Sequence, residues 1–332
     1  MTLLKIEDLT IKFKSRKGVV TAVDKLSLDV KKGSSLGIVG ESGSGKSVTS
    51  LAIMGLLQEK NTEISGKIHF EDVDLLTLSA EEKRKIRGKS ISMIFQEPMT
   101  SLNPLHTCGK QIMEPILIHQ KGVSKKEVKE TAIDMLRMVG IPSPEQRFHE
   151  YPHQMSGGMR QRIMIAIALV CNTKLLIADE PTTALDVTIQ AQILDLMKNL
   201  SKGSDMSILM ISHDLGVVKE MCEEVVVMYT GQIVEKSPAE LVFEDPLHPY
   251  TKGLLNAIPK ISSEVERLET IEGNVPDALN MPKGCHFQSR CKYAMDRCVH
   301  QTPPLFKQGD GREVRCFLYD GVGRDEDINA TN

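Results

Sequence analysis

The chain contains no tryptophan, and aromatic residues make up only 4% of its 332 residues. Its core must therefore be packed mainly by aliphatic side chains, to which 17 methionines add adaptable apolar surface. A formal net charge of −3 argues against the overall positive field that nucleic-acid-binding proteins usually carry. With 41% apolar and 26% charged residues, the composition is typical of a globular protein of one or two domains.

Long apolar runs are also missing. The longest, residues 163–171, is much shorter than the roughly 20 residues that a membrane-spanning helix needs. Residues 1–8 turn acidic before the apolar core of a secretory signal can form. We therefore expect a cytosolic protein that does not itself cross a membrane.

The pattern of apolar residues predicts an α/β fold. Alternation over residues 3–38 predicts a set of short strands, and residues 36–39 a buried strand. Residues 96–155, rich in proline and then helical, read as a helical insertion. Later helices are expected from Ser156 to near Asn172 and over 189–200, and strands over 175–178, 207–211 and 225–229.

The stretch GESGSGKS, residues 40–47, has the spacing of a phosphate-binding loop between a strand and a helix. Glycines let successive backbone N–H groups point at a phosphate, and the helix N-terminus adds a positive dipole end. Lys46 is expected to neutralise phosphate oxygens and Ser47 to bind Mg²⁺. The alternative is a Gly-Ser linker. The expected nucleotide contacts are Gly40, Glu41, Ser42, Gly43, Ser44, Gly45, Lys46, Ser47 and Val48.

An apolar strand at residues 175–178 ends in two carboxylates, Asp179 and Glu180. We expect Asp179 to hold Mg²⁺, usually through water, and Glu180 to polarise the water that attacks the γ-phosphate. The alternative is a strand that ends at a solvated acidic turn.

Further motifs resemble those of ATP-binding cassette proteins. Residues 155–162, MSGGMRQR, resemble the signature of that family and lie between the phosphate loop and Asp179, as they do in the family. Gln96 resembles the Q-loop glutamine, residues 184–186 the D-loop, and His213 the switch histidine. The resemblance implies a P-loop NTPase fold: a RecA-like core with an antiparallel β subdomain and a helical insertion at about 96–155.

The resemblance also implies roles for these residues. The N-terminus of the signature helix would form a second anion site, which faces the γ-phosphate held by a partner subunit. His213 would contact the γ-phosphate and help to hold Glu180, and Gln96 would bind Mg²⁺ or water. The alternatives are an ordinary helix N-cap and a loop histidine. The implied nucleotide contacts are Ser156, Gly157, Gly158 and Asp186.

Two positions depart from the general family pattern. Met159 stands where the general signature has glutamine, but peptide-importer subunits are similar in carrying methionine there. Phe13 is the candidate that stacks on adenine, in place of the more common tyrosine, and the alternative is a core phenylalanine. We expect the basic residues 14–17 to be merely solvated.

Three segments indicate what the ATP is used for. Residues 95–104, 243–251 and 272–277 resemble segments of oligopeptide and dipeptide importers. This implies an ATPase at the cytoplasmic face of the membrane, with a second cassette subunit, which family resemblance favours as a paralogue, and two membrane permeases. An extracytoplasmic binding protein would deliver the peptide, and no nucleic acid is expected. The alternatives are an importer of another solute, such as nickel, or a soluble ATPase of DNA repair or translation.

An apolar groove near the Q-loop is where such a family member would receive its permease. The alternative is a small core under the helical insertion. The candidate residues are Met93, Phe95, Met99, Leu102, Leu105 and Met113.

Four cysteines lie together near the C-terminus, separated by five, six and seventeen residues: Cys285, Cys291, Cys298 and Cys316. These gaps exceed those of usual zinc sites and favour a [4Fe–4S] cluster, which the family resemblance also implies for some members. Zinc and free or oxidised thiols are the alternatives. We expect the cysteines in an extension over residues 236–332 that follows a nucleotide-binding domain over 1–235.

Overall fold

The computed structural model describes residues 1–96, 101–183, 185–202, 205–257 and 270–321. In this described part, strands form a four-stranded sheet, in the order β2-β1-β4-β5, and an eight-stranded sheet, in the order β11-β12-β10-β9-β3-β8-β7-β6. Their bounds are β1 Thr2–Ser15, β2 Gly18–Lys31, β3 Ser35–Val39, β4 Thr62–Phe70, β5 Val73–Asp74, β6 Ile91–Ile94, β7 Leu175–Asp179, β8 Ser207–Ser212, β9 Glu224–Tyr229, β10 Gln232–Pro238, β11 Phe306–Lys307 and β12 Glu313–Val314.

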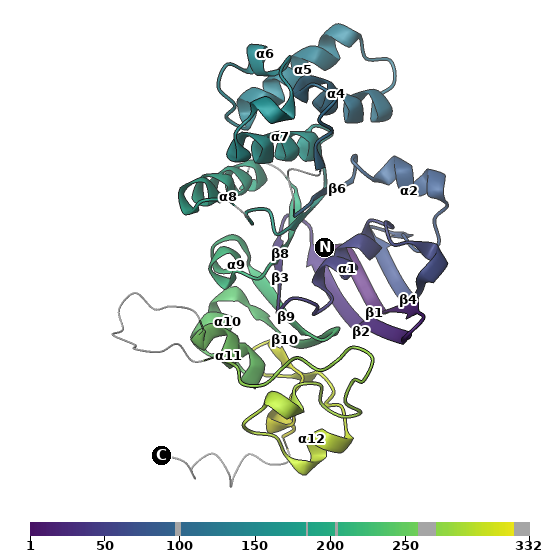
Figure 1. Cartoon of the computed structure of the whole chain (residues 1–332), viewed down its shortest axis with the longest axis vertical. Coiled ribbons are helices and arrows are strands. Elements are labelled where there is room, and N and C mark those ends of the chain that lie inside the picture. Colours follow the sequence, from purple (N-terminus) through teal and green to yellow (C-terminus); the bar gives the residue numbers. More distant parts are fainter. Residues whose placement is uncertain (97–100, 184, 203–204, 258–269, 322–332) are drawn as a thin grey trace.

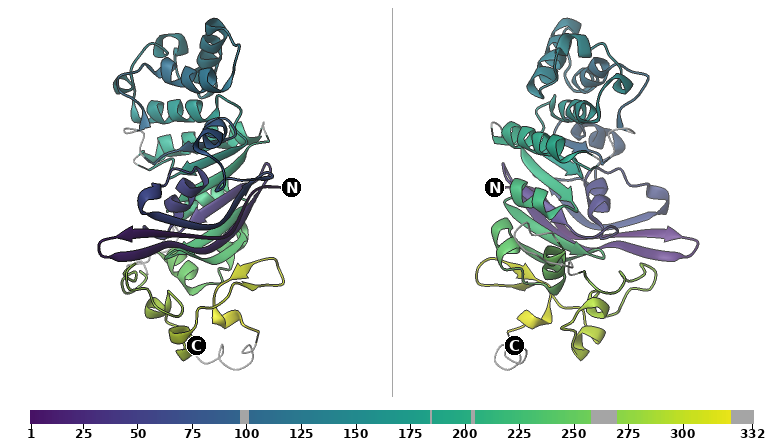
Figure 2. Two further views of the ribbon diagram at one scale, coloured as in Figure 1. Left: turned by 90° about the vertical axis from the view of Figure 1, so that its right-hand side faces the viewer. Right: turned by 60° about the vertical axis from the view of Figure 1, so that its left-hand side comes forward.

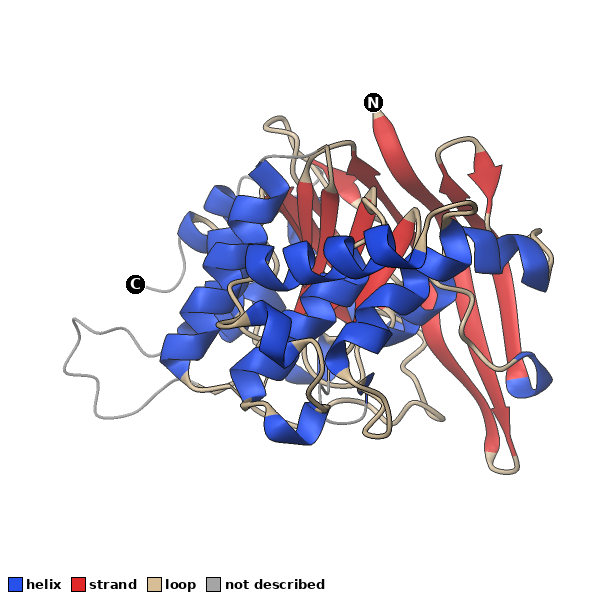
Figure 3. Ribbon diagram, turned by 90° about the horizontal axis from the view of Figure 1, so that it is seen from above, coloured by secondary structure: helices blue, strands red, loops and turns tan. Residues whose placement is uncertain are grey.

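Helices pack around the larger sheet, as Figure 3 shows from above. The α-helices are α1 Lys46–Ile53, α2 Ala80–Ile86, α4 Cys108–His119, α5 Lys125–Met138, α6 Pro144–Arg147, α7 Gly157–Leu169, α8 Val187–Lys202, α9 Leu215–Met221, α10 Ala239–Glu244, α11 Pro249–Asn256 and α12 Asp296–His300. The short 3-10 helices are η1 Glu59–Asn61, η2 Pro152–Gln154, η3 Gln288–Arg290 and η4 Phe317–Tyr319. No helix of the described residues is long and apolar enough to cross a membrane.

The antiparallel β subdomain is built from two long strands, so the prediction of several short strands over residues 3–38 is wrong. Both β1 and β2 have 14 residues. Their pairing register shifts between Ile6 and Leu9 and again between Leu9 and Ile11, and Asp8 has a φ of 48°. Bulges of this kind interrupt the apolar alternation without ending the strand, which is why the sequence pattern looks broken.

The larger sheet has a parallel centre. Strand β3 lies between β8 and β9, parallel to both, and β7 lies parallel between β8 and β6. Alternate residues of β7 enter two different cores, Leu176 and Ala178 on one face and Leu175 and Ile177 on the other. A parallel sheet buried on both faces in this way brings the carboxyl ends of β3, β6, β7 and β8 to one edge, where ligands bind in such folds.

The described part of residues 96–155, where the helical insertion is predicted, contains α4, α5, α6 and η2, and the bounds of the insertion stay a prediction. Figure 1 shows it as the teal region at one end of the molecule, with the yellow C-terminal residues at the other, and Figure 2 shows the same from two sides. Helix α5 begins at a capping box, in which the Ser124 side chain and that of Glu127 bond each other's backbone N–H.

The C-terminal residues continue the larger sheet. Strand β10 pairs with β9 and, on its other side, with β12, which pairs with β11. The domain boundary predicted between residues 235 and 236 falls within β10 and stays a prediction. The segment that carries the four clustered cysteines is thus attached to the nucleotide-binding core by backbone hydrogen bonds.

Candidate nucleotide-binding site

The glycine loop lies between β3 and α1, at the carboxyl edge of the larger sheet. Gly40 has a φ of 151° and Gly45 a φ of 101°, conformations that residues with a Cβ rarely adopt. A Cβ on Gly40 would lie 2.2 Å from the Met228 carbonyl oxygen, and one on Gly45 would lie 2.5 Å from that of Ala22. Both glycines are therefore required by the path of the loop and its tight packing.

Lys46 is folded into this loop. Its Nζ donates to the carbonyl oxygens of Gly40 at 2.7 Å and Glu41 at 2.9 Å, and the residue is only 6% exposed. Burial lowers the pKa of Lys46, while Glu180 and Asp179 oppose that shift. The ammonium is therefore held at the centre of the loop, where the oxygens of a phosphate can replace the carbonyls as its partners.

Two of the three residues expected to bind Mg²⁺, Ser47 and Asp179, lie side by side. Ser47, at the start of α1, donates its hydroxyl to Asp179 Oδ1, at the end of β7, at 3.1 Å. Burial raises the pKa of Asp179, and the neighbouring charge of Glu180 adds to this effect. A buried carboxylate next to a hydroxyl offers the oxygen ligands that Mg²⁺ prefers, so these residues fit the ion.

Glu180 is the meeting point of three loops. Gln96, which follows β6, donates its Nε2 to the Glu180 carboxylate at 2.6 Å, and His213, which follows β8, places Nδ1 at 3.0 Å from it. Thr183 donates its hydroxyl to the same carboxylate at 3.1 Å. Sequence reasoning missed Thr183, since threonine in a loop gives no signal of its own. Glu180 itself has a φ of 49°, a strained backbone conformation typical of functional sites.

The signature residues lie on another part of the molecule. Ser156 is the N-cap of α7, and its hydroxyl accepts the backbone N–H of Met159 at 3.3 Å. Ser156 and Gly157 are exposed, so the N-terminus of α7 is open to solvent. Figure 1 shows α7 beside the helical insertion and α1 beside the β subdomain. Residues 156–158 are therefore not brought to the chain's own phosphate loop.

The D-loop prediction is described in part, because Ala184 lies outside the described residues. Asp186 is exposed, and its Oδ1 accepts the backbone N–H of Ile189 at 3.0 Å at the start of α8. Like Ser156, Asp186 has a side chain tied to a helix start and faces solvent.

Phe13 lies on β1, opposite Val20 of β2 and Thr62 of β4. It is half-buried against the core of the β subdomain, as is Val48. Residues 14–17 are exposed, as predicted, and Lys14 pairs with Glu63 at 3.1 Å. The position of Phe13 is compatible with both the core interpretation and the adenine interpretation.

The apolar residues near the Q-loop divide into two groups. Leu102 is buried, and Met93 and Met113 pack partly buried against the cores. Phe95 is 41% exposed and Leu105 81% exposed, so among the described candidates these two offer the most surface to a partner. Met99 lies outside the described residues.

The cysteines do not form a metal centre as they stand. In the described residues, which include all four, no group of three or more His, Cys, Asp or Glu side chains is arranged to hold a metal ion. Burial raises the pKa of Cys316 to about 12, and the charges of the other three cysteines act in the same direction. The geometry therefore gives no support to the predicted [4Fe–4S] cluster or to zinc, because the sulfurs are not gathered around one point.

The remaining cysteines and histidines take ordinary roles. Cys108, Cys171 and Cys222 are buried in the core cluster, as expected of packing residues. His286 shares a hydrogen bond of 2.8 Å with Thr230 Oγ1.

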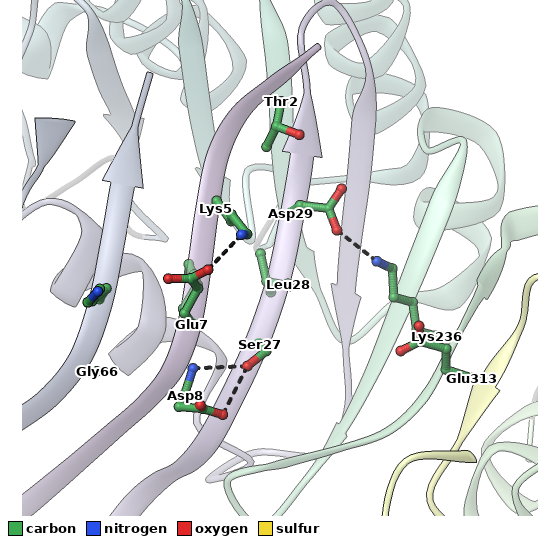
Figure 4. A pocket seen from close by; sticks show the side chains of 12 residues that line it. Thr2, Lys5, Glu7, Asp8, Ser27, Leu28, Asp29, Gly66, Lys236 and Glu313 are labelled. Atoms are coloured by element: carbon green, nitrogen blue, oxygen red, sulfur yellow. Dashed lines mark hydrogen bonds and ion pairs between the residues drawn. The ribbon is translucent and has the colours of Figure 1, made fainter. Parts of the chain in front are cut away.

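A hollow of about 900 Å³ lies outside this site, between β1 and β2 on one side and β10 on the other (Figure 4). Four of its charged residues form ion pairs, Lys5 with Glu7 at 2.6 Å and Lys236 with Asp29 at 3.1 Å. Because these four charges already have partners, the hollow is a weaker candidate for a charged ligand than the glycine loop.

The chain matches two family models. Residues 23–183 match the family described as ABC transporter, and residues 234–298 match the oligopeptide/dipeptide transporter, C-terminal region. Among solved structures, a dimeric post-hydrolysis state of the ATP-binding cassette MJ0796 bound to ADP and Pi is similar, with a TM-score of 0.64 and 27% identity. The match covers 71% of this chain and 98% of that one.

Curated relatives match along almost the whole chain. The oligopeptide transport ATP-binding protein AppD of Bacillus subtilis (strain 168) is 53% identical, over 98% of this chain and 99% of its own length. The dipeptide transport ATP-binding protein DppD of Escherichia coli (strain K12) is 49% identical, with the same coverage of 98% and 99%. The chain therefore belongs to the ATP-binding cassette family, among the ATP-binding proteins of oligopeptide and dipeptide transport.

Proposed function

We propose that this chain is the ATP-hydrolysing subunit that energises the import of dipeptides or oligopeptides across the cytoplasmic membrane. The single observation that carries the catalytic part is the convergence of Gln96, His213 and Thr183 on the carboxylate of Glu180. The transported class is supported by the relatives at 53% and 49% identity, which are named for oligopeptide and dipeptide transport.

The phosphate loop binds the triphosphate of ATP. Backbone N–H groups from Gly43 to Ser47 and the N-terminus of α1 point at the phosphates, and Phe13 stacks on the adenine. Lys46 exchanges its bonds to the loop carbonyls for bonds to the β- and γ-phosphate oxygens. Each exchange replaces a neutral acceptor with a charged one, so nucleotide binding is favoured at this position.

The Ser47 hydroxyl, Asp179 and Gln96 would hold Mg²⁺. The ion would neutralise charge on the phosphates. No cluster of three carboxylates is needed for such a site, because Mg²⁺ in nucleotide sites keeps few protein ligands.

Glu180 orients and deprotonates the water that attacks the γ-phosphorus in line with the leaving group. Its carboxylate is fixed by Gln96 and Thr183, while His213 contacts both Glu180 and the γ-phosphate. Hydrolysis then breaks the bond between the β-γ bridging oxygen and the γ-phosphorus. Hydrolysis removes the contacts between these residues and the γ-phosphate, so their arrangement differs before and after hydrolysis.

The exposed N-terminus of α7 completes the site of a second cassette subunit. Ser156, Gly157 and Gly158 supply N–H groups and a hydroxyl to the γ-phosphate held by the partner, and Asp186 lies at the same interface. ATP therefore favours the closed pair, and its hydrolysis removes those contacts. Phe95 and Leu105 receive the permease, so closure is transmitted to the membrane subunits.

The assembly consists of this chain, a second ATPase subunit that we propose is a paralogue, and two membrane permeases. An extracytoplasmic binding protein delivers the peptide, so this chain lies peripherally at the cytoplasmic face without contacting peptide. The proposed assembly has no nucleic-acid partner. The alternative is import of another solute, such as nickel, and competition experiments with peptides and nickel distinguish it from peptide import.

The four clustered cysteines would be the ligands of a [4Fe–4S] cluster, although no three of them are arranged around one point in the described residues. The support is their spacing in the sequence, because a cubane separates its ligands farther than a single ion does. Anaerobically purified protein should then contain iron. Iron-free protein of full stability would contradict this assignment.

The function is tested by uptake of labelled dipeptide into proteoliposomes that contain the whole transporter. Lys46→Ala should abolish MgATP binding and uptake. The matched control is Lys60→Ala, because Lys60 is exposed on η1, away from the phosphate loop. Undiminished uptake by the Lys46→Ala transporter, or competition by nickel ions and not by peptides, would contradict the proposal.

A further inference from the structure

Arg290 of the C-terminal extension reaches the phosphate loop. It forms two hydrogen bonds with the carboxylate of Glu41, at 2.8 and 3.1 Å. The two residues are 249 positions apart in the sequence. The Arg290 side chain is only 5% exposed, so this is a buried, bidentate ion pair between the extension and the nucleotide site.

The guanidinium of Arg290 is fully surrounded by partners. Its Nε donates to the Glu272 carbonyl oxygen at 3.2 Å, and it lies over the rings of Tyr229 and Phe287, at 5.9 and 6.0 Å from their centres. These contacts fix the direction of the side chain. Arg290 is therefore held by its other contacts, and through the ion pair it fixes the position of the Glu41 carboxylate.

The backbone of Glu41 is tied to the same end of the molecule. Its N–H donates to the hydroxyl of Tyr250 on α11 at 2.9 Å, and Tyr250 is fully buried. The side chain and the backbone of Glu41 are thus both held by residues of the C-terminal extension, Arg290 and Tyr250.

Charge explains why such a contact matters. Glu41 is the acidic residue of the stretch GESGSGKS, and the loop must accept an anionic triphosphate. A free carboxylate beside the phosphates would repel them, since like charges in a partly buried site interact strongly. A bidentate guanidinium neutralises this carboxylate and holds it in one direction.

We propose that Arg290 is a positioning residue of the nucleotide site, which sets the affinity for MgATP by neutralising and fixing Glu41. This inference rests on the proposed assignment of residues 40–48 as the nucleotide site. Arg290 ends η3 and directly precedes Cys291. The arginine therefore couples the cysteine-bearing segment of the extension to ATP binding, and coupling of this kind acts equally in both directions.

The test is the dissociation constant of MgATP for the full-length chain, measured as a double-mutant cycle. Arg290→Gln should weaken binding roughly tenfold, within the range usual for coupled sites. In the Glu41→Gln background, the further change Arg290→Gln should alter the dissociation constant by less than about twofold, because no carboxylate charge is left to neutralise. The double variant should regain most of the affinity lost in Arg290→Gln, and Arg290→Lys should stay within about threefold of the wild type.

Arg312→Gln is the matched control. Arg312 is another mostly buried arginine of the extension, and its ion pairs, with Asp310 at 2.7 Å and Asp245 at 3.1 Å, lie within the extension and do not involve the loop. Its substitution should leave the dissociation constant unchanged even where Tm falls.

Two outcomes would overturn the inference: unchanged affinity in Arg290→Gln, or a loss of the same size when Arg290→Gln is made in the Glu41→Gln background. Arg290→Lys keeps the positive charge, so a tenfold loss in that variant at unchanged Tm would contradict the inference as well. Lys46→Ala, measured in parallel, separates this inference from the function: if it binds MgATP normally, the site assignment itself is wrong.

Discussion

The buried side chain of His248 makes the stability of the folded chain depend on pH. It is the N-cap of α11, where Nδ1 accepts the backbone N–H of Tyr250 at 3.0 Å. Burial lowers the pKa of His248 to about 3, and the charge of Arg315 adds to this. Between pH 3 and the ordinary value of 6.5, the unfolded chain therefore binds a proton that the folded chain does not.

Between pH 3 and 6.5, His248 should therefore make the free energy of unfolding rise by about 1.4 kcal/mol per pH unit. Above pH 6.5, His248 should add no further pH dependence. His248→Asn keeps an acceptor for the N-cap but removes the titrating ring, so its Tm should fall less steeply from pH 6.5 to 4.5 than that of the wild type. His300→Asn, at an exposed position, should keep the wild-type slope. Parallel slopes in all three proteins would contradict the assignment.

At the scale of elements, local spacing predicted most of what positions the site. The glycine loop, the strand before Asp179 and the signature helix each carry their signal within about ten residues, and each forms as expected. Strands β4 and β10 were missed, because neither contributes a motif, although β10 forms a tight hairpin with β9. The pair of Glu41 and Arg290 lies beyond any local pattern, since the fold alone brings the two together.

The cysteine-bearing segment provides a prediction at this scale. A Cβ on Gly284 would lie 2.1 Å from the Cys298 carbonyl oxygen, whereas Gly309 has no atom within 4 Å of such a Cβ. Gly284→Ala should therefore raise hydrogen exchange across residues 284–300 and lower Tm by several degrees, because backbone atoms cannot shift cheaply. Gly309→Ala should match the wild type. Equal exchange in both variants would show that the close contact has no energetic weight.

At the scale of the whole molecule, the residues proposed to bind nucleotide lie on two faces. The phosphate loop and Glu180 lie at the carboxyl edge of the larger sheet, whereas the N-terminus of α7 opens to solvent beside the helical insertion (Figure 1). Sequence motifs predicted both halves of the proposed site, and the fold places them apart within one molecule. The proposed second cassette follows from that separation.

Ser156→Arg tests this separation. The bulky cation at the N-terminus of α7 should abolish ATP hydrolysis by the assembled transporter at the partner's site, because it occupies the place of the γ-phosphate. The isolated chain should still bind MgATP with wild-type affinity. Ser156→Thr, which keeps the hydroxyl, should retain hydrolysis. If Ser156→Arg lowered MgATP affinity of the isolated chain as much as Lys46→Ala does, the two-subunit site would be refuted.

The most direct test of the account is the rate of ATP hydrolysis by the assembled transporter that carries Glu180→Gln in this chain and in the equivalent position of its partner. The account predicts that MgATP still binds and that hydrolysis falls at least about 100-fold, the usual contribution of a positioned base. Hydrolysis at the wild-type rate, with Glu180→Gln present in both subunits, would contradict it.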